Sequence, residues 1–216
     1  MITVTKLSDQ VHDLLLRQIM EGDRSPGSTL RELDLVEELQ VSRTPIREAI
    51  SRLAAEGFVE VQPNRGATVR LLDADQVRQI FEVREALEAR AAEAACPRMS
   101  EEDLERLSSI AGGIAETEPD APVQRWRLDR ELHTLIAGRT GNALLAEEIE
   151  RYIDLAGLVG SRARYQRGDA EAAHQEHLRI VSALENCDAA AARAAMATHI
   201  RNAGELIMRR SPAADR

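Results

Sequence analysis

The sequence predicts a mostly α-helical protein that contains one short β-hairpin near its N-terminus. The first observation is composition: 44% of the 216 residues are hydrophobic, but only 2% are aromatic. Few aromatic and β-branched residues disfavour an all-β fold, and abundant alanine, leucine and arginine favour helices. The second observation is patterning, because apolar residues recur at helical spacing along most of the chain and alternate only between residues 58 and 71. The length fits one or two domains.

Three helices are expected before the hairpin. The first covers about residues 8–21 with Ser8 as its cap, and the second covers about residues 31–39. The third begins near Thr44, which is expected to cap it, and ends at Gly57. The apolar positions expected to face inward are Val11, Leu14, Leu15 and Ile19 in the first helix, Leu33, Val36 and Leu39 in the second, and Ile46, Ile50 and Leu53 in the third.

The hairpin follows directly after the third helix. Residues 58–62 and 67–71 have strand-like patterns and flank a turn at 63–66 that contains proline, asparagine and glycine. Residues 40–42 are expected to form a tight turn between the second and third helices. Three helices and a hairpin in this order are the arrangement of a winged helix–turn–helix domain. The second helix of the helix–turn–helix pair lies in the major groove of DNA in such domains.

The exposed side of this recognition helix carries short polar and arginine side chains near its start. An arginine there can reach a guanine edge or a phosphate, and a cation beside glycine in the hairpin turn suits a minor groove or a phosphate. A single arginine on a helix is more often part of a solvated face, but the whole set favours DNA contact. The residues expected at the interface on this basis are Ser42, Arg43, Thr44 and Arg47 in the helix and Arg65 and Gly66 in the turn.

The same region resembles a family of bacterial regulators. The segments that carry the resemblance are Pro26-Gly27, Leu30-Arg31-Glu32, Val41-Ser42-Arg43-Thr44-Pro45-Ile46-Arg47-Glu48-Ala49-Ile50, Leu53, Glu56-Gly57 and Arg65-Gly66-Ala67-Thr68-Val69. Over about residues 8–71 the chain is similar to the GntR family of transcription regulators. Gln40 departs from that family, which often has glycine in this turn. The resemblance implies that the DNA interface includes Arg31, Arg43, Thr44, Arg47 and Gly66.

Net charge bears on how this domain would bind DNA. The whole chain has a formal charge of −9, and residues 1–72 carry 9 lysines and arginines against 11 acidic residues. Only residues 42–70 are basic, with 5 arginines against 3 glutamates. Because this basic patch is small, we expect DNA affinity to depend on two copies of the chain. A homodimer on a palindromic double-stranded operator is the expected arrangement, with an affinity that falls as salt rises.

The remainder of the chain is expected to form an all-α bundle of about six helices. Their expected positions are about 73–95, 100–117, 121–138, 142–163, 170–186 and 188–209. Ser100 and Asp103 fit a capping box at the start of the second of these helices, and residues 167–169 are expected to separate the fourth from the fifth. We therefore expect two domains, a DNA-binding domain at 1–72 and an all-α domain at 73–216.

Four ionisable side chains on three helices are expected to point into this bundle. Asp129 and His133 are four residues apart and so share one side of a helix, while His177 and His199 lie on the apolar faces of two others. The apolar residues on the same faces are Trp126, Leu132 and Ile136 for the first helix, Leu178, Val181 and Leu184 for the second, and Met196, Ala203 and Leu206 for the third. A single histidine on such a face is more often a hydrogen-bonded core residue.

Buried titratable groups need partners, and one divalent transition metal would serve all four. Three imidazoles and a carboxylate suit Zn²⁺ best, with Ni, Mn or Fe as alternatives. A second resemblance supports this interpretation over about residues 76–206. The matching residues are Phe81-Glu82-Val83-Arg84-Glu85-Ala86-Leu87-Glu88, Asp129, His133, Glu176-His177 and His199. They are similar to the FCD domain of the FadR subfamily, which implies that Asp129, His133, His177 and His199 are the metal ligands.

The same resemblance implies that the effector is a small carboxylic acid that completes the coordination of the metal. Arg84 matches a family position and could hold a carboxylate, or it could instead pair with Glu85 or Glu88. His174 could be a ligand, a neighbour of the ligands or part of the pocket wall. His12, in the first domain, is expected to be structural.

These features predict a ligand-responsive transcriptional regulator, most simply a repressor. The alternatives are a metal sensor, in which the ion itself is the signal, and a metal-dependent enzyme. The enzyme is disfavoured because the sequence contains no nucleophile motif, glycine-rich phosphate loop or HExxH, and Glu176 would point about 100° away from His177. The sequence shows no apolar run of about 20 residues and no secretory leader, which predicts a cytoplasmic protein with no membrane partner. Cys96 and Cys187 are expected to be reduced thiols.

Overall fold

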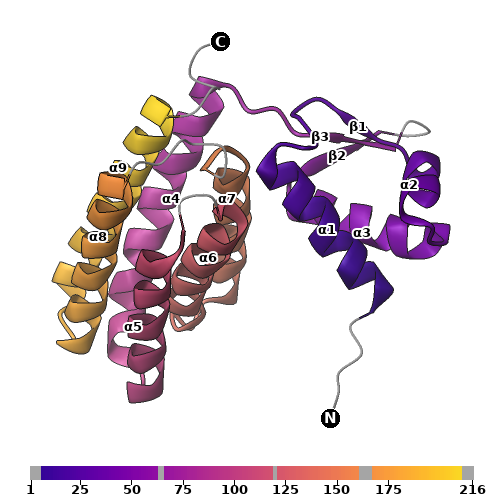
Figure 1. The fold of residues 1–216 in the computed structure, drawn as a ribbon. Helices are drawn as coiled ribbons and strands as arrows, with labels where there is room; N and C mark the ends of the chain where they lie inside the picture. Colours follow the sequence, from indigo (N-terminus) through magenta and orange to yellow (C-terminus); the bar gives the residue numbers. More distant parts are fainter. Residues whose placement is uncertain (1–5, 63–65, 119–120, 161–166, 211–216) are drawn as a thin grey trace. The chain divides into compact units, whose positions relative to one another are not determined.

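The computed structural model describes residues 6–62, 66–118, 121–160 and 167–210. Its contacts divide the chain into two compact units, Met1–Leu71 and Leu72–Arg216. Across the described residues, the regular structure consists of nine α-helices, one 3-10 helix and three short strands (Figure 1). The mostly helical fold class predicted from the composition and patterning is confirmed. No described helix is long and apolar enough to cross a membrane.

The first unit combines three helices with a three-stranded antiparallel sheet. Its elements are α1 (Leu7–Glu21), β1 (Thr29–Leu30), α2 (Glu32–Leu39), α3 (Arg43–Ala55), β2 (Val59–Gln62) and β3 (Gly66–Val69). Strand β3 lies between β1 and β2, so that Thr68 is opposite Thr29 on one side and Glu60 on the other. The core contains fully buried side chains from α1, α3 and the start of the hairpin, including Leu15, Ile19, Ile46, Leu53 and Phe58.

Three local expectations in this unit were wrong. Strand β1 was not predicted, because two residues are too few to show the alternation that marks a strand. Helices α1 and α3 begin earlier than expected, so the cap positions are Lys6 and Ser42, each two residues before the expected caps Ser8 and Thr44. Neither cap position makes a side-chain hydrogen bond to its helix. Both helix starts therefore depend on packing of the apolar faces instead of on a capping side chain.

Helix α2 buries a different side chain from the one expected. Leu35 is 1% exposed and Leu33 is 57% exposed, while the other two positions expected to face inward are half-buried. An eight-residue helix offers too few turns for its pattern to select the buried face. The helix ends at Gln40, which has a left-handed backbone with φ of 53°. Glycine adopts this conformation without steric conflict, which explains why a glycine is common at this turn in the resembling family.

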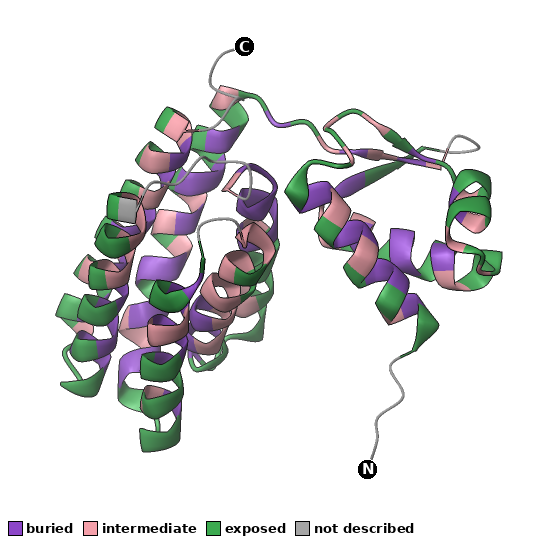
Figure 2. Ribbon diagram, viewed as in Figure 1, coloured by how far each residue is buried: buried purple, intermediate pink, exposed green. Residues whose placement is uncertain are grey.

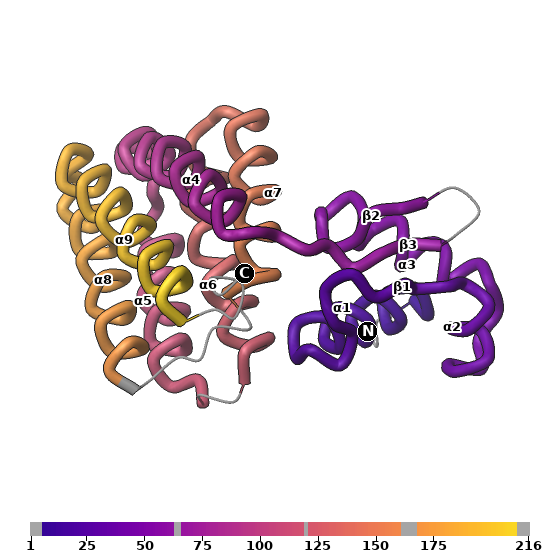
Figure 3. The backbone as a smooth tube through the Cα atoms, turned by 90° about the horizontal axis from the view of Figure 1, so that it is seen from above, coloured from indigo at the N-terminus to yellow at the C-terminus, as the bar shows by residue number. Residues whose placement is uncertain are grey.

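In its described residues, the second unit is a bundle of six α-helices. They are α4 (Ala74–Ala95), α5 (Glu101–Glu116), α6 (Pro122–Gly138), α7 (Ala143–Gly160), α8 (Arg167–Glu185) and α9 (Ala189–Arg210), with a 3-10 helix, η1 (Cys96–Arg98), after α4. Helix α4 packs against α6, α7 and α9, and α8 packs against α5 and α9 (Figure 3). The expected break at residues 167–169 was wrong in position, because Gly168 and Asp169 already lie inside α8.

Small residues allow the close packing of α4 against α9. Ala92 and Ala95 are buried in α4, and Ala192 is buried in α9. Figure 2 shows the buried residues on the sides of the helices that face one another. The capping box expected from Ser100 and Asp103 is confirmed at the start of α5, and a second one is formed by Asp73 and Gln76 at the start of α4.

The two cysteines are 91 residues apart in sequence but adjacent in space. The Cys187 thiol lies 3.7 Å from the carbonyl oxygen of Cys96, and no disulfide joins them. Burial of Cys96, together with the neighbouring Cys187 thiol, raises the pKa of the Cys96 thiol to about 11. A thiol with so high a pKa is protonated at neutral pH and is a poor nucleophile.

Candidate functional site

The start of helix α3 presents the polar face that the sequence predicts for DNA contact. Ser42, Arg43, Thr44 and Arg47 are all exposed, while the opposite face of the helix is buried in the core. Arg47 Nε lies 3.1 Å from Glu32 Oε1 on α2. Arg47 is exposed and Glu32 is half-buried, so a phosphate can compete with the glutamate for the guanidinium at little energetic cost.

The other predicted interface residues lie around the sheet. Arg31 is exposed and directly precedes α2, whereas Arg65 lies outside the described residues. Gly66 begins β3 with φ of +89°, and a Cβ atom there would lie 2.3 Å from the carbonyl oxygen of Leu30. The close approach of β1 to β3 therefore requires glycine at this position, independently of any contact with DNA.

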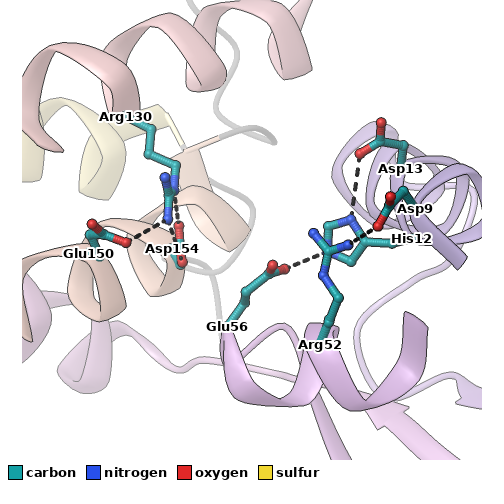
Figure 4. A network of polar contacts seen from close by, with 8 residues as sticks. All are labelled: Asp9, His12, Asp13, Arg52, Glu56, Arg130, Glu150 and Asp154. Carbon is teal, nitrogen blue, oxygen red and sulfur yellow. Dashed lines mark hydrogen bonds and ion pairs between the residues drawn. The ribbon is translucent and has the colours of Figure 1, made fainter. Parts of the chain in front are cut away.

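A network of charged side chains fixes α1 against α3 in the first unit (Figure 4). His12 Nε2 lies 2.7 Å from Glu56 Oε2, and Arg52 Nη1 lies 2.6 Å from Asp9 Oδ1. His12 is 4% exposed and serves to connect the two helices, so its expected structural role agrees with these contacts. Figure 4 also draws a separate group within the second unit, in which Arg130 of α6 contacts Asp154 and Glu150 of α7.

The bundle brings together the four residues predicted as metal ligands. Asp129 and His133 come from α6, His177 from α8 and His199 from α9, and one donor atom from each lies within 4.8 Å of the other three. The three histidines are buried, and the Asp129 side chain is 31% exposed. Asp129 Oδ1 lies 3.3 Å from His177 Nε2 and 3.7 Å from His133 Nε2. The ring centroids of His177 and His199 are 4.4 Å apart.

Two carboxylates that were not predicted as site residues contact two of these imidazole rings at their Nδ1 atoms. Glu88 Oε2 lies 2.5 Å from His133 Nδ1, and Glu88 Oε1 accepts a hydrogen bond of 2.7 Å from Arg84 Nε. Glu176 Oε2 lies 3.0 Å from His199 Nδ1, and Asn202 Nδ2 donates to the other oxygen of Glu176. Carboxylates in such positions orient imidazole ligands and increase their basicity.

The sequence offered a partial signal for these carboxylates. Arg84 and Glu88 are four residues apart on one face of α4, and Glu176 is adjacent to His177. What the sequence does not contain is the packing of α4 against α6 and of α8 against α9, which places each carboxylate beside its histidine.

Electrostatics distinguish the histidines of the cluster. Burial, with His199 acting in the same direction, lowers the pKa of His177 to about 4. Burial also disfavours the charged form of His133, but the carboxylates of Glu88 and Asp129 outweigh it and raise the pKa of His133 to about 9. Burial likewise opposes the charge on Glu88, yet Arg84 and His133 lower its pKa to about 2. At neutral pH His177 is therefore an uncharged imidazole, whereas His133 is a charged imidazolium between the ionised carboxylates of Glu88 and Asp129.

The donor set fits a divalent metal ion. Both ring nitrogens of His177 are buried without a hydrogen-bond partner among the residues that the structure describes, which is costly unless another group satisfies them. Ligands at about 2.0–2.1 Å from a tetrahedral ion lie about 3.3–3.4 Å from one another, close to the 3.3 Å between Asp129 Oδ1 and His177 Nε2. Three imidazoles and one carboxylate are ligands that Zn²⁺ and neighbouring transition metals accept.

The cluster opens onto a cavity of about 290 Å³. Its lining includes Asp129, His177 and His199 from the cluster, together with Arg84 and Glu176. Arg84 is buried and forms the ion pair with Glu88 that the sequence left as an alternative to a ligand contact, yet it also faces this cavity.

His174 does not join this arrangement in the described structure. Its Nδ1 atom lies 3.2 Å from the carbonyl oxygen of Ala111 on α5, and His174 belongs neither to the Asp/His cluster nor to the cavity lining. The expectation that Leu178 faces inward was also wrong, because Leu178 is 39% exposed. His177 is inward, but α8 is turned so that its neighbour Leu178 lies toward the surface.

Comparison with known proteins identifies both units. The family of bacterial regulatory proteins named gntR matches residues 7–69, and the FCD domain family matches residues 79–202. The chain belongs to the GntR family of bacterial regulators. Within that family it combines the DNA-binding domain with an FCD domain, and the resemblance stated from the sequence is confirmed.

Relatives of this GntR regulator are transcription factors. It is 30% identical to the Nta operon transcriptional regulator of Aminobacter aminovorans, over 74% of each chain. It is 29% identical to the transcriptional repressor RspR of Escherichia coli, over 93% of this chain and 89% of the relative. The solved structure of McbR/YncC from E. coli shares the fold, with a TM-score of 0.75 at 23% identity and coverage of 95% and 99%. The families and relatives are regulators of transcription and not enzymes.

Proposed function

We propose that this GntR regulator is a repressor that binds a palindromic operator as a homodimer and responds to a small carboxylic acid bound at a metal-dependent site. The observation that carries the proposal is the cluster of Asp129, His133, His177 and His199, which opens onto a cavity in the same chain as a DNA-binding domain. A ligand in that cavity contacts side chains from α4, α6, α8 and α9. It can therefore favour one arrangement of these helices over another.

The DNA-binding part of the proposal rests on the exposed start of α3. Arg43 and Arg47 are the cations at this end of the helix, and Ser42 and Thr44 add hydroxyl groups for phosphates or bases. The small basic patch alone would bind DNA weakly, so two copies on two half-sites supply the affinity.

In the metal-dependent part, the four clustered side chains hold a divalent ion, with Zn²⁺ as the first choice and Ni, Mn or Fe as alternatives. When bound, the ion supplies a positive charge that attracts a carboxylate. Glu88 and Glu176 keep the rings of His133 and His199 oriented. Arg84 contributes a second positive group, because its Nη atoms have no hydrogen bond among the described residues while its Nε is held by Glu88.

The second candidate function is a metal sensor. The observation in its favour is that the four ligand side chains come from three helices, α6, α8 and α9. Helix α8 also carries Glu176, which contacts His199 on α9, and α9 carries Asn202, which donates to Glu176. Ion binding alone would therefore tie α6, α8 and α9 together. The two functions differ in whether operator affinity changes with Zn²⁺ alone or only with an acid in addition.

Non-denaturing mass spectrometry of the purified protein tests the proposal first, because it measures subunit number, bound metal and retained small molecules together. A dimer that carries a metal ion and an organic acid supports the acid-responsive repressor. A dimer with metal alone, whose operator affinity responds to Zn²⁺ without an acid, favours the metal sensor. A protein that cannot be loaded with any of the four metals overturns the metal-dependent site.

Operator binding requires a separate measurement, with the binding site selected from random double-stranded DNA. We expect Arg47→Ala to weaken binding of the selected site without lowering metal content. Arg52→Ala is the matched control, because Arg52 lies on the same helix but contacts Asp9 of α1. Equal operator affinity of wild type and Arg47→Ala would contradict the role proposed for α3.

A further inference from the structure

The cavity beside the Asp/His cluster has one polar end and a largely apolar remainder. The polar end consists of Asp129, His177 and His199 with Arg84, Glu176 and Asn202. Three further charged residues, Arg125, Asp169 and Arg209, also line the cavity. Apolar side chains from five helices cover much of the other walls, and they are Phe81, Ile114, Trp126, Ile153, Leu206 and Ile207. A ligand that fills this space therefore contacts charge at one end and mostly hydrocarbon or aromatic groups along the rest of its surface.

Two glycines make room for the two aromatic rings in the wall. A Cβ atom on Gly157 of α7 would lie 2.3 Å from Trp126 Nε1, and a Cβ atom on Gly204 of α9 would lie 2.9 Å from Cγ of Phe81. Glycine inside a helix is unfavourable relative to alanine, so its presence facing each ring calls for a packing reason. With glycine at both positions the rings lie back against the helices, and the space in front of them stays open.

The positive groups at the cavity are few among the described residues. Arg125 Nη2 donates to the carbonyl oxygen of Glu118, and Arg209 Nη1 lies 3.6 Å from Glu205 Oε2. Arg84 lies where the polar end of the cavity meets its apolar wall, because its guanidinium carbon is 5.2 Å from the centroid of the Phe81 ring. A carboxylate at the polar end would thus have the ion and Arg84 as partners, and its attached group would meet Phe81 and Trp126.

We propose that the effector is a monocarboxylic acid with a compact apolar body of about the size of a phenyl ring. This inference rests on the proposed function and specifies the ligand class of the same site. The cavity volume of about 290 Å³ is just below the range of typical small-molecule sites, roughly 300–1,000 Å³, and so suits a small ligand. An aromatic body gains additional stabilisation from edge or offset contacts with the rings of Trp126 and Phe81.

A polar dicarboxylate suits this cavity poorly. Its first carboxylate can occupy the polar end. The second would meet either the apolar wall, where it loses water without gaining a partner, or the guanidinium groups of Arg125 and Arg209, which already have partners. An apolar body without a carboxylate would leave the charged end of the cavity unmatched. The structure therefore favours a ligand that has both a carboxylate and an apolar body. Compounds that lack one or the other test each part separately.

Trp126 is the single tryptophan of the chain, so its fluorescence reports directly on this wall of the cavity. The experiment titrates Zn²⁺-loaded full-length protein with benzoate, which has both parts, with succinate, which lacks the apolar body, and with benzyl alcohol, which lacks the carboxylate. Isothermal titration calorimetry gives the dissociation constants, and metal analysis after each titration checks that Zn²⁺ is retained. We expect benzoate to bind at least tenfold more tightly than either control and to change the fluorescence of Trp126.

Substitution of the glycines tests where benzoate binds. Gly157→Ala and, separately, Gly204→Ala should each weaken benzoate binding at least tenfold and leave Zn²⁺ affinity unchanged, because the displaced ring enters the cavity. Gly112→Ala is the matched control, since Gly112 lies in α5 and a Cβ atom added there would meet no atom within 4 Å. Two glycine variants on different helices keep the test valid if one of them fails to fold.

The outcomes separate this inference from the proposed function. If succinate binds more tightly than benzoate and releases the operator, the inference that the effector has an apolar body is wrong. The proposed function as an acid-responsive regulator would still stand. Equal binding of benzoate by both glycine variants and wild type would place the ligand elsewhere and also overturn the inference. Failure of the Zn²⁺-loaded protein to bind any operator would instead contradict the proposed function, whatever the acids do.

Discussion

Glu88 and Glu176 show how single side chains shape the candidate metal centre. Each carboxylate contacts the Nδ1 atom of one histidine, Glu88 that of His133 and Glu176 that of His199. An imidazole held at Nδ1 presents Nε2 to the centre of the cluster. Glu88 is itself held by Arg84, so the orientation of His133 depends on a chain of two buried ionic contacts that begins at the cavity wall.

Glu88→Gln is expected to weaken Zn²⁺ binding by about 10–100-fold, because loss of an orienting carboxylate reduces both the basicity and the alignment of the ligand. Competition with a chelator measures the affinity. Glu85→Gln is the control, since Glu85 lies on the same helix and contacts Arg201 on the surface. Circular dichroism of the metal-free proteins checks that Glu88→Gln folds. An affinity equal to that of the control would show that Glu88 does not position His133.

Gly66→Ala is expected to destabilise the first unit by about 2–4 kcal/mol, because it adds an overlap with the Leu30 carbonyl to the strain of a left-handed backbone. Gly27→Ala is the comparison, since Gly27 also has a positive φ but a Cβ atom there would meet nothing within 4 Å, and about 1 kcal/mol is expected. Urea unfolding measures both. Equal losses in the two variants would mean that β1 moves away from β3 without penalty.

The side chain of Asp103 connects the start of α5 to the end of α6. Asp103 completes the capping box of α5 with Ser100, and its carboxylate accepts two hydrogen bonds from Arg139, which directly follows α6. The hydrogen bonds from Arg139, followed by that from the Ser100 backbone, hold the pKa of Asp103 well below its usual range. The start of one helix and the end of the next are thereby fixed relative to each other.

Asp103→Asn is expected to lower stability at pH 7 and to matter less in acid. A carboxyl group with a depressed pKa stabilises the folded state above its unfolded pKa of about 3.9, and this contribution is lost as pH falls through the folded pKa. The difference in urea midpoint between wild type and Asp103→Asn should therefore be largest near pH 7 and shrink below about pH 4. Glu101→Gln, an exposed change in the same helical turn, should show no such trend. A constant difference from pH 7 to pH 3 would contradict this account.

The whole molecule consists of two units that have separate hydrophobic cores. The first is stabilised around Leu15, Ile46 and Phe58, whereas the second is stabilised by the helices around the Asp/His cluster. Because all four clustered ligand residues belong to the second unit, bound metal adds its binding energy only to the folding of that unit.

Scanning calorimetry is expected to show that Zn²⁺ raises the unfolding temperature of the second unit and leaves that of the first unchanged. At free Zn²⁺ of about 1,000 times the dissociation constant, the added stability is about 4 kcal/mol. Chelation should reverse the shift. His177→Ala provides the control, because it removes a ligand from the cluster and should abolish the effect. A Zn²⁺-dependent shift that persists in His177→Ala would place the metal elsewhere.

Much of the fold could be predicted from the sequence because its signals are local. The helical period of the bundle, the capping pair of Ser100 and Asp103 and the hairpin after α3 all depend on residues close together in the chain. The misplaced features were those with weak local signals. Strand β1 has two residues, α2 has eight, and the start of α3 lacks a capping side chain, so packing against other elements determined each of them.

The candidate site divides in the same way. The sequence by itself determined the family, the polar start of α3 and the histidines on apolar helix faces, because each depends on residue type and spacing along one element. Only the tertiary structure decided that Glu88 and Glu176 contact His133 and His199, that His174 faces α5, and that Trp126 and Phe81 lie against glycines of other helices. These contacts join elements that are distant in the chain, and their geometry is set by how closely the helices can pack, which no single segment of sequence encodes.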